Sequence, residues 1–134
     1  PLILWGRSLG GAVGALLAKS EPPDLLILES SFPNMVAVAS HLYPYLPVHL
    51  LLVDRWPAAP ALAHLDCPKL IVHSEEDDLI PFALGQELYE AAAEPKAMLR
   101  IHGGHEGGWF DSGELYTRAI REFLGANLPS LQKS

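Results

Sequence analysis

The side chains in this chain that can do chemistry are concentrated at three places. Ser8 stands between glycines in residues 6–10, Asp77 and Asp78 lie in an acidic run, and His102 and His105 lie in the glycine-rich residues 102–108. A serine hydroxyl becomes a nucleophile when a histidine accepts its proton, and a carboxylate then holds the histidine in the required tautomer. The order Ser, Asp, His is the one that a strand–serine–helix elbow requires. The serine, one of the aspartates and one of the histidines are therefore candidates for acyl transfer through a covalent intermediate.

The sequence around Ser8, Gly-Arg-Ser-Leu-Gly, separates an apolar run from a stretch of small apolar residues. Residues 2–5 are typical of a buried strand and residues 9–19 of a helix, which places the serine at a sharp turn whose glycines allow close approach. The helix brings backbone N–H groups and its positive dipole end beside the hydroxyl. The pentapeptide alone also suits a structural turn or a phosphate at the helix N-terminus, so the acid and the histidine decide its role.

The candidate acid follows an apolar strand at residues 69–72. Asp77 and Asp78 stand between this strand and an apolar helix start at residues 79–82, whereas the two glutamates before them are typical of a solvated face. A carboxylate at this place can orient a histidine and stabilise its imidazolium. The alternative role is a helix N-cap, which one of the two aspartates would provide.

The candidate base follows a further strand at residues 97–101. Glycines at positions 103, 104, 107 and 108 allow a tight turn that brings a histidine of this run to the serine. His102 and His105 also suggest a metal pair to which the acidic run would add carboxylates. Glycine spacers do not preset two ligands as a helix does, so the sequence predicts no metal site and no cofactor.

Strands and helices alternate along the chain, which predicts an α/β fold. The expected strands are residues 2–5, 25–28, 69–72 and 97–101, and the expected helices are residues 9–19, 82–93 and 113–125. Continuous apolar runs indicate strands buried on both faces, as in a parallel sheet flanked by helices. Ligands of such sheets bind beyond the carboxyl ends of the strands, where all three candidates fall.

Residues 32–66 interrupt this alternation with several prolines and many aromatic and leucine residues. We interpret them as two or three short helices that form a cap over the site, the alternative being a crossover helix with irregular flanks. Within this cap, Tyr43 and Trp56 are candidate substrate contacts, as are Glu29 and Ser30 after the second strand. The apolar cap favours an acyl group as substrate, although the same side chains would equally serve to pack the core.

Composition sets the class of protein and excludes several partners. The 134 residues suffice for a single domain with a core, and 49% of them are hydrophobic, as in a globular protein. The net charge of −7 leaves no basic stripe for nucleic acid, and no apolar run is long enough to span a membrane. A single cysteine, Cys67, excludes an intrachain disulfide and favours a reducing, cytoplasmic location.

Together these motifs resemble the C-terminal half of an α/β-hydrolase, nearest to the ABHD-type serine hydrolases and to serine aminopeptidase-like domains. The matching segments are residues 6–11, 26–32, 70–81 (similar to the family's His-Gly-x-x-Asp-x-x-Val-Pro) and 103–105. The resemblance implies that Ser8, His105 and Asp77 form a catalytic triad that cleaves an ester, thioester or amide bond of a small acyl or peptide substrate. It also implies that the Leu9 N–H supplies half of the oxyanion hole.

Two residues depart from the family pattern, and neither departure removes a catalytic group. Ser74 stands where the family usually has glycine, and Glu106 follows the histidine where asparagine is common. The larger departure is that the chain starts with Pro1 and a strand, so we expect an N-terminally truncated piece of a longer enzyme. The outer edge of strand 2–5 would then be unpaired and open to self-association.

In the family, the second oxyanion donor comes from the N-terminal half of the fold. Losing one such donor costs about a hundred- to a thousandfold in rate. An alternative function is therefore that of an impaired hydrolase-like fragment that acts as a binding module. Within the enzyme class, esterase, thioesterase and aminopeptidase-like peptidase remain open, because the motifs around the triad do not separate them.

Overall fold

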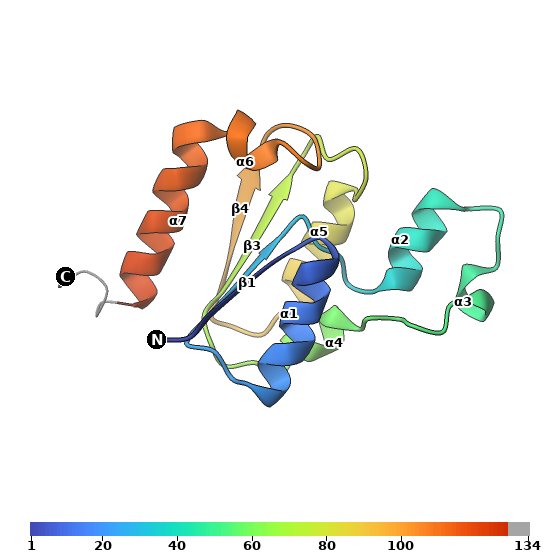
Figure 1. Ribbon diagram of the computed structural model, residues 1–134, viewed down its shortest axis with the longest axis horizontal. Coiled ribbons are helices and arrows are strands. Elements are labelled where there is room, and N and C mark those ends of the chain that lie inside the picture. Colours follow the sequence, from blue (N-terminus) through green and yellow to red (C-terminus); the bar gives the residue numbers. More distant parts are fainter. Residues whose placement is uncertain (129–134) are drawn as a thin grey trace.

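A four-stranded parallel sheet forms the centre of the computed structural model, which describes residues 1–128 (Figure 1). Its strands, in their order across the sheet, are β1 (Ile3–Arg7), β2 (Leu25–Glu29), β3 (Lys69–Ser74) and β4 (Lys96–Ile101). The helices are α1 (Leu9–Ser20), α2 (Met35–Leu42), α3 (Val48–Leu51), α4 (Ala58–Leu62), α5 (Phe82–Ala91), α6 (Gly108–Asp111) and α7 (Gly113–Asn127). The predicted α/β fold with a parallel sheet is confirmed.

Different helices cover the two faces of the sheet, because side chains alternate along each strand. On β2, Leu26 and Leu28 pack with α1, α4 and α5, whereas Leu25 and Ile27 pack with α7. Figure 1 shows α7 on one side of the strands and α1 and α5 on the other. Every residue of β2 is buried, as the continuous apolar run predicted.

The segment predicted to be a cap contains the three short helices α2, α3 and α4. Of these, α4 belongs to the layer of α1 and α5, because Ala61 and Leu62 are buried in the same core cluster. By contrast, α2 and α3 extend outward from that layer (Figure 1) and leave Tyr45 95% and Leu50 75% exposed. That this segment forms a cap over a site stays a prediction.

β1 lies at one edge of the sheet and, among residues 1–128, pairs only with β2. Its Trp5 is 49% exposed. Self-association through this edge stays a prediction. The strand continues beyond the predicted residues 2–5 as far as Arg7, so the turn at Ser8 begins directly at the end of the strand.

Candidate active site

Ser8 occupies a strained turn between β1 and α1. Its φ of 52° and ψ of −123° lie in a region that L-residues rarely adopt. Hydrogen bonds to its backbone hold this conformation: the Ser8 N–H donates to the Glu29 carbonyl (2.8 Å), and the Ser31 hydroxyl (2.9 Å) and the Gly11 N–H (3.0 Å) donate to the Ser8 carbonyl. A Cβ at Gly6 would overlap the Gly10 carbonyl, so glycine is required for the strand and the helix to approach this closely. The elbow predicted from the pentapeptide is therefore present.

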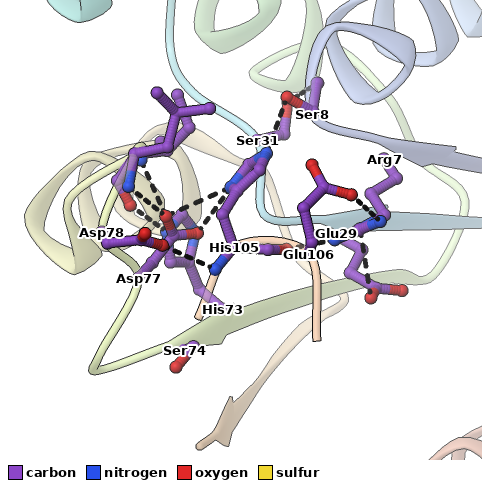
Figure 2. A network of polar contacts seen from close by, with 12 residues as sticks. Arg7, Ser8, Glu29, Ser31, His73, Ser74, Asp77, Asp78, His105 and Glu106 are labelled. Atoms are coloured by element: carbon purple, nitrogen blue, oxygen red, sulfur yellow. Dashed lines mark hydrogen bonds and ion pairs between the residues drawn. The ribbon is translucent and has the colours of Figure 1, made fainter. Parts of the chain in front are cut away.

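Ser8, His105 and Asp77 form a continuous hydrogen-bonded chain at the carboxyl ends of the strands (Figure 2). Nε2 of His105 lies 3.1 Å from Ser8 Oγ, and its Nδ1 lies 2.9 Å from Oδ2 and 3.1 Å from Oδ1 of Asp77. The side chains of His105 and Asp77 are 5% and 0% exposed. This geometry lets Nδ1–H donate to the carboxylate while Nε2 accepts the proton of the hydroxyl.

The Asp77 carboxylate is held in place by the backbone that follows it. Its Oδ1 accepts hydrogen bonds from the N–H groups of Leu79 (3.0 Å) and Ile80 (2.7 Å). The alternative that one of the two aspartates caps α5 is wrong, because α5 has Pro81 at its N-cap and no side-chain cap. Asp77 instead caps the turn before the helix, which aims the other carboxylate oxygen at His105.

Asp78 has a separate role that the sequence did not reveal. Its Oδ1 accepts the backbone N–H of His105 (2.9 Å), and this bond lowers the pKa of the Asp78 carboxyl below its ordinary value. Ser74, at the position where the family usually has glycine, donates its hydroxyl to the Gly103 carbonyl. Both bonds tie the glycine-rich loop to the end of β3 and to the turn that follows it.

The short helix α6 follows this glycine-rich loop and was not predicted.

His73 lies beneath the site and is fully buried. Its Nε2 is 2.8 Å from the Ile80 carbonyl and 3.5 Å from Asp77 Oδ2, so it supports the turn that carries the acid. A Cβ at Gly85 of α5 would overlap the His73 ring, which shows how closely the helix packs on it. From the sequence we expect His73 to end the strand and to pack or hydrogen-bond near the site.

We expect the free energy of unfolding to fall as the pH drops below 6.5, with His73 as a cause. Burial disfavours the charged ring and lowers the pKa of His73 below its ordinary value of 6.5 in the folded protein. Above that pH the ring is neutral in both states and the stability is fully present. Below it the unfolded state binds a proton that the folded state excludes, so stability is lost.

One such group contributes a slope of at most about 1.4 kcal/mol per pH unit. Chemical denaturation at a series of pH values measures this slope. His73→Gln keeps a donor for the Ile80 carbonyl and should flatten the slope, whereas an equal slope in the variant would show that His73 is not responsible.

Comparison with known proteins points to one superfamily. The chain is 38% identical over 121 residues to the uncharacterized protein Rv2307c of Mycobacterium tuberculosis, covering 90% of the chain and 43% of that protein. It is 32% identical, over an alignment of 159 positions, to lysophosphatidylserine lipase ABHD12 of Rattus norvegicus, covering 98% of the chain and 40% of the lipase. The chain thus spans less than half the length of these relatives. No family model matches it.

Solved structures share its fold. An esterase of Pyrococcus furiosus superposes with a TM-score of 0.71 at 15% identity, over 94% of the chain and 54% of the esterase. A monoacylglycerol lipase of Paleococcus ferrophilus superposes with a TM-score of 0.65 at 21% identity, over 93% of the chain and 68% of the lipase. The chain belongs to the α/β-hydrolase superfamily. The resemblance inferred from the motifs is thereby confirmed.

The four residues predicted to contact substrate in this α/β-hydrolase lie in different surroundings. Glu29 is 4% exposed and lies beside Arg7 and Tyr116, and Ser30 is buried next to it with a φ of 48°. Tyr43 is 57% exposed at the C-cap of α2, and Trp56, which precedes α4, packs against the core cluster. Their contact with substrate stays a prediction.

Metal binding by this α/β-hydrolase finds no support in the described part of the chain. Within residues 1–128, no group of three or more His, Cys, Asp or Glu side chains could hold a metal ion. Nδ1 of His102, one of the two histidines of the suggested metal pair, lies 3.3 Å from Oε1 of Glu76.

None of the described helices is long and apolar enough to cross a membrane. A cavity of about 570 Å³ lies between the end of α1 and the start of β3, at the opposite end of the sheet from Ser8.

Proposed function

We propose that this chain carries the catalytic triad of a serine hydrolase that cleaves carboxylic esters of apolar acyl groups. Ser8 is the nucleophile, His105 the general base and acid, and Asp77 the residue that orients His105. The observation that carries the proposal is the Ser8–His105–Asp77 chain, with distances of 3.1 Å and 2.9 Å, on a strained elbow.

The proposed acylation step uses only groups of the elbow and the triad. Ser8 Oγ attacks the ester carbonyl carbon while its proton passes to Nε2 of His105. Leu9 begins α1, so its N–H has no carbonyl of the same helix to bind and can donate to the developing oxyanion. Collapse of the tetrahedral intermediate breaks the bond to the alcohol, which takes the proton from Nε2.

Deacylation repeats these steps with water. Nε2 accepts a proton from water as its oxygen attacks the acyl-enzyme carbonyl, and then returns that proton to Ser8 Oγ as the acid leaves. Asp77 stabilises the imidazolium in both halves of the cycle. The second oxyanion donor of this superfamily comes from the N-terminal half of the fold, so we propose that the full-length protein supplies it.

An apolar acyl group as substrate is supported by two observations. Residues 30–53 contain no Asp, Glu, Lys or Arg, although the whole chain has a net charge of −7. The helices α2 and α3 and the C-cap of α2 expose side chains that are largely apolar, including Tyr43, Leu50 and Leu51. The names of the ABHD12 relative and of the Paleococcus structure, both lipases, agree with an apolar acyl substrate.

We retain the cytoplasmic location as a prediction.

The proposal is tested on the full-length protein with a fluorophosphonate probe and with glycerol monoesters of increasing acyl length. We expect the probe to label Ser8 and kcat/KM to rise with chain length, by roughly fourfold for each methylene that becomes buried. Absence of labelling would contradict the serine mechanism. Labelling without any dependence on chain length would contradict the acyl-binding part alone, and faster cleavage of peptide amides would favour the peptidase alternative.

A further inference from the structure

We propose that Arg7 is a positioning residue that holds His105 against Ser8, anchored by Glu29 and Tyr116. We call Arg7, Glu29 and Tyr116 the Arg7 clasp. The proposal rests on the proposed function, because it assigns to the clasp the task of keeping the catalytic base in place. None of the three side chains belongs to the triad.

Arg7 reaches from the end of β1 to the loop that carries the histidine (Figure 2). Its Nη2 donates to the His105 carbonyl, and its Nη1 lies 3.4 Å from a carboxylate oxygen of Glu106. The Arg7 side chain is 33% exposed, whereas that of Glu106 is 86% exposed, so the pair with Glu106 is a weak surface contact. The bond to the His105 carbonyl is the contact that bears on the site.

The other side of the guanidinium faces a buried carboxylate. Arg7 Nε lies 3.8 Å from Glu29 Oε1, and the Glu29 side chain is 6% exposed. A carboxylate at this depth needs partners, and Arg7 is the cation that the described residues place beside it.

Tyr116 of α7 completes the anchor. Its hydroxyl donates to Glu29 Oε2 at 2.8 Å. Burial and this hydrogen bond raise the pKa of Tyr116, which therefore stays a donor at neutral pH.

The clasp matters because His105 lies in a loop whose glycines impose little restraint of their own on the backbone. Glycine occupies positions 103, 104, 107 and 108 around it. Asp78 accepts the His105 N–H at 2.9 Å, and Arg7 binds its carbonyl, so the backbone is held on both sides of the residue. Arg7 also directly precedes Ser8 in the sequence. One strand end therefore fixes the nucleophile and the loop of its base relative to each other.

The first experiment compares Arg7→Ala, Arg7→Lys and the control Arg100→Ala in the full-length protein. Arg100 forms a surface pair with Glu75 at 3.2 Å, with 63% of its side chain exposed. A misplacement of about 1 Å can cost on the order of a hundredfold in rate. We expect kcat of Arg7→Ala to fall by roughly 10- to 100-fold with KM within about twofold. Arg7→Lys should retain an intermediate kcat, and Arg100→Ala should match the wild type.

Addition of guanidinium ion separates positioning from a general loss of stability. The side chain removed in Arg7→Ala is partly exposed, so millimolar guanidinium can enter its place and should recover part of kcat. Arg7→Lys and Arg100→Ala should gain nothing. Glu29→Gln should also lower kcat, and should have a smaller effect when Arg7 is already alanine, because the two residues act through the same contact.

Order of the His105 ring provides a readout that does not depend on activity. We expect the imidazole ¹⁵N NMR signals of His105 to be single and sharp in the wild type and in Arg100→Ala, and broadened or doubled in Arg7→Ala. Equal kcat values for Arg7→Ala and Arg100→Ala, or unchanged His105 signals, would overturn the proposal. A wild-type protein that no fluorophosphonate labels would contradict the proposed function, while the NMR comparison would still decide whether Arg7 orders the ring.

Discussion

Replacing Ser8 with alanine is expected to lower kcat for ester hydrolysis by about 10⁴- to 10⁶-fold. The variant loses Oγ, the atom that attacks the carbonyl, and with it the acyl-enzyme route. KM should change little, because the hydroxyl contributes little to ground-state binding. The activity that remains would come from substrate binding and from the oxyanion donor at Leu9.

The measurement is steady-state kinetics on a glycerol monoester, together with fluorophosphonate labelling. Ser20→Ala is the matched control: Ser20 lies on the same helix, and its hydroxyl only donates to the Leu17 carbonyl (3.1 Å). It should retain wild-type kcat and labelling. If Ser8→Ala kept kcat within about tenfold of the wild type, Ser8 would not be the nucleophile.

Replacing Asp77 with asparagine is expected to lower kcat by about 10⁴-fold. The amide oxygen can still accept the N–H groups of Leu79 and Ile80, so the turn is preserved. The amide NH₂ would instead face Nδ1 of His105 and donate to it. This favours the tautomer with its proton on Nε2, which cannot accept the proton of Ser8.

The neighbouring Asp78→Asn is the control for this substitution. Its amide oxygen can still accept the His105 N–H, as the carboxylate does at 2.9 Å. We expect kcat to fall by less than about tenfold, because the hydrogen bond is kept but is weaker to a neutral amide oxygen than to a carboxylate. Equal losses in the two variants would contradict the assignment of Asp77 as the orienting acid. The ¹⁵N NMR signals of His105 would show the tautomer directly.

These predictions concern residues that local sequence patterns and chain order narrow to a few candidates. The pentapeptide at residues 6–10 indicated the elbow because a strand, a turn and a helix are encoded by neighbouring residues. The continuous apolar runs likewise indicated a parallel sheet, and parallel strands bring their carboxyl ends to one edge. Ser8, one of the two aspartates and a histidine of residues 102–105 could be proposed together on this basis. Their roles remain to be tested by the variants above.

Sequence could not choose between the two aspartates by local pattern, because both follow the same strand. The tertiary structure gives them different partners, the imidazole of His105 for Asp77 and its backbone N–H for Asp78. The family resemblance had assigned the acid to Asp77, and this role stays a prediction. The N-cap alternative failed because a turn intervenes between the aspartates and α5.

By itself, therefore, the sequence determined the fold class, the elbow and the set of triad candidates, since each depends on neighbouring residues or on chain order. Only the tertiary structure decided the side-chain partners around them. Arg7 meets His105 across 98 positions, and Glu29 meets Tyr116 across 87. Such pairs depend on strand register and on how α7 packs on the sheet, and no local pattern encodes these.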